Sequence, residues 1–161
     1  MPRSRVKQTG ERMLGRPQHT IQSLEPIEIY VDGRGERADG CGSGFAWKQP
    51  KTGRQEVIWE DHLTNNQAEY KALLLAIKAL PASSTARILT DSQIVSEQFN
   101  GRYAVHDPTL DALLKEVAAE ISGKSLHISV AWVPRAANLA DKLLSSKGAK
   151  FSLDSSAASS H

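Results

Sequence analysis

The order of strand-like and helix-like segments is the feature that most constrains the fold of this chain. Five segments show the alternation or the β-branched content typical of strands, at residues 27–33, 45–49, 54–63, 86–91 and 126–134. Four segments show helical periodicity with capping or stop residues, at residues 64–80, 92–100, 109–121 and 138–146. Three strands come first, and each later strand follows a helix. This order predicts an α/β fold with a five-stranded mixed sheet, an antiparallel meander of three strands plus two crossover strands, flanked by helices.

The length and composition predict one folded domain with a short extension at each end. The chain has 161 residues, of which 40% are hydrophobic and 24% are charged, which suffices for one core. We expect a flexible basic arm at 1–26, a folded domain at 27–147 and a Ser-rich tail at 148–161. Residues 1–20 contain five Lys or Arg and one Glu, which leaves 15 basic against 17 acidic residues elsewhere. Such an arm either binds a polyanion or is a solvated tail.

Several functional classes are excluded by what the sequence lacks. The single cysteine, Cys41, cannot form an internal disulfide, and the five histidines show no zinc-binding spacing. There is no run of about 18 apolar residues and no apolar centre of a secretion signal. We therefore expect a cytoplasmic protein in a reducing compartment, with no membrane contact and no small-molecule cofactor. The small size favours a monomer.

One carboxylate lies where the helical pattern calls for an apolar side chain. Glu69 shares the stripe of Leu73, Ile77 and Leu80 in the helix predicted over 64–80. Burying an unpaired carboxylate costs several kcal/mol, and no Lys or Arg shares this stripe. Glu69 therefore predicts a function rather than a packing role.

Three further acidic residues lie at the ends of predicted elements. Asp32 ends the first strand, Asp91 ends the fourth strand and Asp141 opens the last helix. Taken singly, these residues are explained by a turn, a helix cap and a favourable helix dipole. Together with Glu69 they are expected to meet at one edge of the sheet, where their mutual repulsion requires a cation. Open carboxylate sites suit Mg²⁺ or Mn²⁺, and a pair of such ions suits phosphodiester hydrolysis.

Four segments resemble the signature blocks of type 1 ribonuclease H, in the order of that family. They are YVDG (30–33), TNNQAEY (64–70), LTDSQIVSEQFNG (89–101) and WVPRAANLAD (132–141). The resemblance covers about residues 27–145 and is greatest to the compact archaeal and bacterial forms. It implies an endonuclease that hydrolyses the RNA strand of RNA/DNA hybrids with two divalent ions, leaving 3′-hydroxyl and 5′-phosphate ends.

The resemblance also implies a role for individual residues. Asp32, Glu69, Asp91 and Asp141 match the family's metal-binding and catalytic quartet. Asn65, Asn66 and Gln93 match positions that read the minor groove of the hybrid through ribose 2′-hydroxyls. Without the resemblance, the asparagines read as helix caps and Gln93 as a solvated side chain. The histidine that family members often have between the last strand and the last helix is absent here. Arg135 is the only ionisable residue in this segment, and we assign it to substrate binding.

The chain departs from the family in one spacing. Asn138 and Asp141 are one residue closer than in the usual family block, which rotates the helix start by about 100°. Either Asn138 or Asp141 must then shift. This departure keeps an alternative open, a non-catalytic nucleic-acid-binding module of the same fold. A related two-metal nuclease acting on another duplex, such as double-stranded RNA, is a further alternative.

Overall fold

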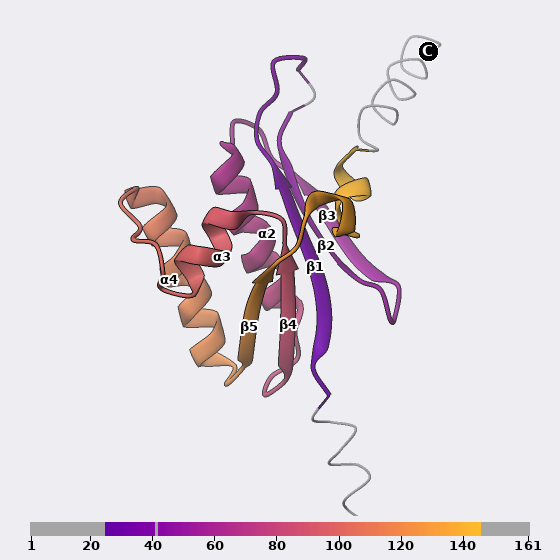
Figure 1. Ribbon diagram of the computed structural model, residues 1–161, viewed down its shortest axis with the longest axis vertical. Coiled ribbons are helices and arrows are strands. Elements are labelled where there is room, and N and C mark those ends of the chain that lie inside the picture. Colours follow the sequence, from indigo (N-terminus) through magenta and orange to yellow (C-terminus); the bar gives the residue numbers. More distant parts are fainter. Residues whose placement is uncertain (1–24, 41, 146–161) are drawn as a thin grey trace, which may run out of the picture.

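The computed structural model describes residues 25–40 and 42–145, so all but the last two residues of the predicted basic arm (1–26) and the whole predicted tail (148–161) lie outside the described residues. The described chain forms one five-stranded sheet, shown in Figure 1. Its strands are β1 (Ile27–Arg34), β2 (Gly44–Gln49), β3 (Arg54–Trp59), β4 (Thr85–Thr90) and β5 (His127–Trp132). Its helices are α2 (Asn65–Ala79), α3 (Gln93–Phe99), α4 (Pro108–Gly123) and the 3₁₀ turn η1 (Arg135–Ala137).

The sheet has the predicted mixed topology. Its strand order is β3-β2-β1-β4-β5, with antiparallel pairing of β1 to β2 and of β2 to β3. The pairing of β1 to β4 and of β4 to β5 is parallel, because helical crossovers precede β4 and β5. The predicted α/β fold, a meander of three strands plus two crossover strands, is confirmed.

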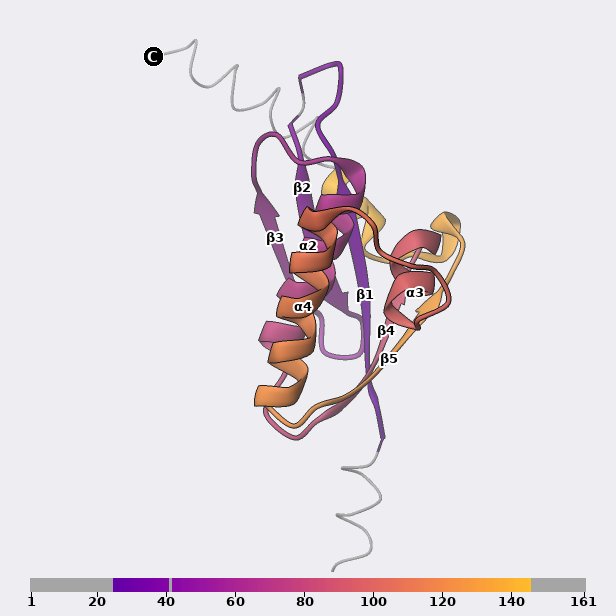
Figure 2. The same ribbon diagram turned by 90° about the vertical axis from the view of Figure 1, so that its left-hand side faces the viewer.

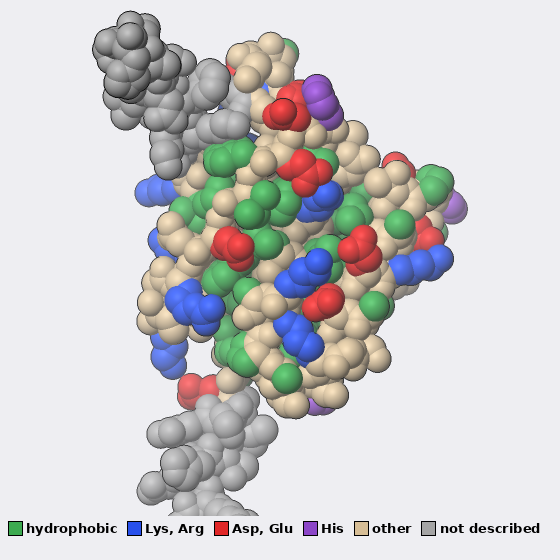
Figure 3. Space-filling model, turned by 180° about the vertical axis from the view of Figure 1, so that it is seen from behind, with side chains coloured by type: hydrophobic (Ala, Val, Ile, Leu, Met, Phe, Trp, Pro, Cys, Tyr) green, Lys and Arg blue, Asp and Glu red, His purple; other side chains and the backbone are tan. Residues whose placement is uncertain are grey.

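Helices α2 and α4 pack together on one face of the sheet, as the turned view in Figure 2 shows. The core lies between them and the strands, where Ile29 and Val31 of β1 meet Leu73 and Ile77 of α2. The alternation along β1 places Asp32 on the opposite face from these two core residues. From behind, side chains of both charges are mixed with hydrophobic ones (Figure 3). None of the helices among the described residues is long and apolar enough to cross a membrane.

Both ends of α2 are held by side-chain hydrogen bonds. Thr64 is the N-cap and forms a capping box with Gln67. At the other end, Lys124 Nζ donates to the carbonyls of Ile77, Lys78 and Leu80. These bonds stabilise both ends of the helix that carries Glu69.

Two predicted boundaries were wrong. The strand predicted to reach residue 63 ends at Trp59, and His62 has a positive φ of 65°. The last helix, predicted to start at Asn138, instead starts at residue 141 after η1, and Asn138 itself is extended. The reason is that the Asn138 side chain bonds to β1 and to Asp91, while its Oδ1 accepts from Ala140 N. These bonds hold residue 138 outside the helix.

Candidate metal centre

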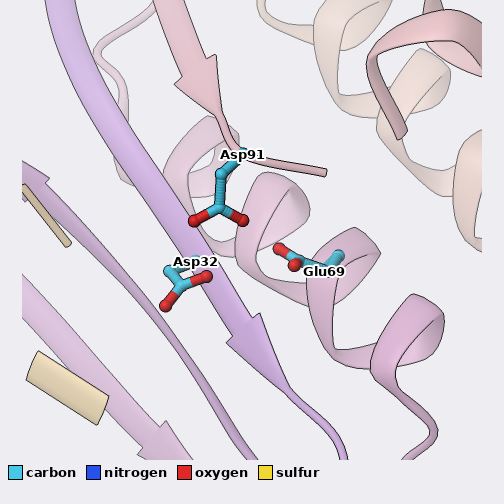
Figure 4. A group of neighbouring side chains, drawn as sticks. All are labelled: Asp32, Glu69 and Asp91. Atoms are coloured by element: carbon cyan, nitrogen blue, oxygen red, sulfur yellow. The ribbon is translucent and has the colours of Figure 1, made fainter. Parts of the chain in front are cut away.

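Three carboxylates from separate elements meet at one edge of the sheet. Asp32 is near the end of β1, Glu69 is in the first turns of α2, and Asp91 follows β4 directly. Each offers an oxygen, and these oxygens lie within 4.8 Å of one another. Figure 4 shows the three side chains directed toward a common space. The predicted convergence of these three residues is thus present.

The approach of α2 to β1 depends on a glycine. A Cβ atom at Gly33 would lie 2.3 Å from the carbonyl carbon of Ala68, so no other residue fits without moving backbone. This close packing lets Gly33 N donate to Glu69 Oε1 at 3.0 Å. A second bond joins the same two segments, in which Gly35 N, two residues after Gly33, donates to Asn65 Oδ1 at 2.7 Å. The glycines therefore let α2 carry Glu69 up to the end of β1.

Burial and mutual repulsion favour the neutral forms of these acids. Burial, followed by the charges of Asp91 and Asp141, raises the pKa of Asp32 from 3.8 to about 7. Burial, followed by the charges of Asp32 and Asp91, raises the pKa of Glu69 well above its usual value. Burial also raises the pKa of Asp91, against the hydrogen bond from Asn138 and the charge of Arg135. A cation among the three would reverse these shifts.

The three residues fit a hard divalent cation. Asp32 Oδ2 is buried and has no hydrogen-bond partner within the described structure, which leaves a lone pair free for a metal. Asp32 and Glu69 are only 3% and 9% exposed, and across residues 25–40 and 42–145 neither these two nor Asp91 forms an ion pair. Carboxylate oxygens without a basic partner are the ligands that Mg²⁺ and Mn²⁺ prefer.

Asp141, the fourth predicted ligand, is not a member of this group. Its Oδ1 accepts from a terminal guanidinium nitrogen of Arg34 at 2.8 Å. It is nevertheless near enough that its charge raises the pKa values of Asp32 and Asp91. Asn138 lies at the site, with its Nδ2 donating to Asp91 Oδ2 at 3.1 Å and to Val31 O at 2.9 Å. With Asn138 and Asp141 one residue closer than in the usual family block, Asn138 contacts Asp91, and Asp141 forms its ion pair with Arg34 of β1.

The predicted substrate-binding residues divide into two sets. Asn65 and Arg135 line an open cavity of about 460 Å³ together with Asp32 and Glu69. Asn66 and Gln93 do not line it, although Gln93 is exposed at the first position of α3. The cavity is therefore acidic at its base and carries amide and guanidinium groups on its wall.

Two arginines of this cavity were missed by the sequence reasoning. Arg34 and Arg37 both line it, and Arg37 pairs with Asp39. The strand period could have pointed to Arg34, because residues two apart in a strand share a face and Arg34 is two residues after Asp32. No local pattern indicated that its partner would be Asp141.

Comparison with known sequences places the chain among ribonuclease H-like proteins. The model of the family described as reverse transcriptase-like matches residues 49–148. The bifunctional protein Rv2228c of Mycobacterium tuberculosis is 40% identical over 83 residues, which are 50% of this chain and 22% of that protein. A ribonuclease H of Methylobacillus flagellatus is 37% identical over 77 residues, which are 47% of this chain and 50% of that protein. The chain thus spans half or less of the length of these curated relatives.

Solved structures show the same fold. The crystal structure of RNase H1 from the halophilic archaeon Halobacterium salinarum has a TM-score of 0.60 and 28% identity, and covers 70% of this chain and 89% of that chain. LC11-RNase H1 in complex with an RNA/DNA hybrid has a TM-score of 0.63 at 24% identity, covers 73% of this chain and 91% of that chain, and supports the fold alone. The chain belongs to the ribonuclease H family, within the group described as reverse transcriptase-like.

Proposed function

We propose that this protein is an endonuclease that hydrolyses the RNA strand of RNA/DNA hybrids with two divalent ions, Mg²⁺ or Mn²⁺, and leaves 3′-hydroxyl and 5′-phosphate ends. The observation that carries the proposal is the group of Asp32, Glu69 and Asp91, with an unpartnered buried oxygen on Asp32. Family membership and relatives named ribonuclease H support the same reaction.

The residues of the site would share the work as follows. Asp32, Glu69 and Asp91 hold the ions, and Asp141 is the fourth ligand. Ions held there supply an activated water and stabilise the leaving oxygen of the phosphodiester. Because the pKa values of Asp32 and Glu69 are raised by burial and by neighbouring carboxylates, binding of an ion at these residues would compete with proton binding.

Recognition of the RNA strand is assigned to the amides at the helix starts. Asn65 Oδ1 already accepts from Gly35 N, so its Nδ2 hydrogens remain to donate to a ribose 2′-hydroxyl. Asn66 and Gln93 are expected to contact the same groove. Arg135 has no ion-pair partner within the described residues, and its charge acts on all three carboxylates. We assign it to a substrate phosphate.

A panel of labelled duplexes tests this function. The purified chain should cut RNA/DNA hybrid in Mg²⁺ or Mn²⁺, with EDTA stopping the reaction and ends of the stated chemistry. Double-stranded RNA, double-stranded DNA and single strands are the matched controls. If another duplex is cut in preference to the hybrid, the substrate assignment is wrong while the metal centre stands.

One observation favours a second candidate, a non-catalytic nucleic-acid-binding module. Asp141 lies outside the three-carboxylate group and is paired with Arg34. Measuring hybrid binding and hybrid cleavage on a single preparation separates the two functions. Tight binding without any turnover in either ion would favour the binding module.

A further inference from the structure

An ion pair at the edge of the candidate metal centre links two distant parts of the chain. Arg34 is the last residue of β1 and shares a face with Asp32, while Asp141 is the first residue of the last helix. The guanidinium and the carboxylate are 2.8 Å apart, and their side chains are only 24% and 26% exposed. Most of the surface of both side chains is therefore sheltered from solvent.

The Arg34 guanidinium is bound to the Asp141 carboxylate at a position where a divalent metal ion could otherwise bind. A carboxylate oxygen that accepts from Arg34 at this distance is not free for a divalent ion in the same direction. An ion beside Asp141 would also lie close to the guanidinium charge, and like charges repel. Within residues 25–40 and 42–145, Asp32, Glu69 and Asp91 form no such ion pair, so the two sides of the centre differ in what an arriving ion must displace.

We propose that Arg34 is a positioning residue that holds Asp141 in the metal-free protein, so that the ion ligated by Asp141 binds in competition with the Arg34 guanidinium. The inference rests on the proposed function, because it needs Asp141 to act as a ligand. It predicts two unequal sites, a tighter one at the three carboxylates and a weaker one at Asp141.

Loss of the contact must be distinguished from loss of a positive charge. Arg34 and Arg135 both lower the pKa values of Asp32 and Asp91 through their charges, but Arg135 makes no contact with Asp141. Removing Arg135 therefore changes the field at both ion sites without releasing Asp141. The ratio of the dissociation constants of the weaker and the tighter ion site reports on the Arg34–Asp141 contact. A change in the electrostatic field of the whole centre would change both constants together and leave their ratio the same.

The experiment is a calorimetric titration of the metal-free full chain with Mn²⁺. The parent is compared with Arg34→Gln, Arg34→Lys and Arg135→Gln, each confirmed as folded by its thermal transition. In Arg34→Gln the dissociation constant of the weaker site should fall by about fivefold relative to that of the tighter site, as expected for the loss of a partly sheltered ion pair. Arg135→Gln should leave the ratio unchanged. Arg34→Lys keeps the positive charge but lacks the planar guanidinium, so its ratio of dissociation constants should lie between those of Arg34→Gln and Arg135→Gln.

A second measurement needs no variant. In the parent, the side-chain ¹⁵Nε resonance of Arg34 should shift during a Mg²⁺ titration in step with the weaker site. A ratio equal in Arg34→Gln and Arg135→Gln, or an Arg34 resonance that stays constant through saturation, would overturn the inference and leave the nuclease assignment intact. No ion uptake by the parent would instead remove the proposed function, and this inference with it.

Discussion

The two sides of the candidate metal centre are built in different ways. Asp32, Glu69 and Asp91 come from β1, α2 and the end of β4, elements that form the core of the domain. Asp141 comes from the segment after β5 and is attached to β1 by its ion pair with Arg34. The comparison indicates that one side is set by core packing, while the other depends on polar contacts that a ligand can replace.

Asn138 joins the two sides. It is 4% exposed, and its side chain bonds to Val31 O, to Asp91 Oδ2 and to Ala140 N. A buried amide with its groups satisfied by three segments is a rigid connector. The last helix is therefore anchored at Asn138, while Asp141, its first residue, is held by Arg34 of β1.

The largest effect is expected from the core-built side. Asp32→Asn should lower the rate of hybrid cleavage by about 10³-fold or more, because a neutral amide would hold a divalent cation far less well than a carboxylate does. The same variant should be more stable than the parent in EDTA, since it removes a buried charge. Cleavage assays in Mg²⁺ and thermal denaturation in EDTA measure the two effects. Asp61→Asn, at an exposed position, is the control, and cleavage at the parent rate by Asp32→Asn would refute the metal centre.

The glycine contact under Glu69 predicts the next largest effect. Gly33→Ala places a Cβ atom 2.3 Å from the Ala68 backbone, and should lower the free energy of unfolding by about 3 kcal/mol. Gly123→Ala is the matched control, because nothing lies within 4 Å of a Cβ there, and it should raise stability by about 0.5 kcal/mol. Urea denaturation measures both. Equal stability of the two variants would show that β1 and α2 are not tightly packed.

The stability of the metal-free protein should fall as pH rises from 5 to 8. The folded-state pKa of Asp32 is raised from 3.8 to about 7, and that of Glu69 is raised too, so the folded state binds protons more tightly than the unfolded state. The stability that this proton binding contributes is complete below about pH 4 and is lost as pH rises through 7. Thermal denaturation in EDTA across this range measures the slope. In Asp32→Asn the dependence of stability on pH should be weaker than in the parent. An equal dependence in the two proteins would mean that other groups cause it.

The smallest effect is expected at Asp141. Asp141→Asn breaks a partly exposed ion pair and should change the free energy of unfolding by no more than about 1 kcal/mol. Its cleavage rate should fall by about 10-fold to 100-fold, less than for Asp32→Asn. Parallel cleavage assays of the two variants give the comparison. An equal loss in both would mean that Asp141 is as essential as the three clustered residues.

Much of this architecture could be predicted because it depends on local patterns. The alternation in β1 and the periodicity of α2 are properties of neighbouring residues, and they placed Asp32 at a strand end and Glu69 against the sheet. The expectation that Asp91 would join them followed from parallel strands ending at one edge. The carboxylate on the apolar stripe of α2, Glu69, is buried and belongs to this group.

The sequence by itself determined the order of strands and helices along the chain and three of the four acids predicted to cluster, since each follows from side-chain period and composition. Only the tertiary structure decided that Asn138 contacts Asp91, that the last helix starts at residue 141, and that Asp141 pairs with Arg34. The physical reason is that these contacts join residues 47 and 107 positions apart. Their formation depends on the packing of β1, β4 and the segment after β5, and no period along the chain records it.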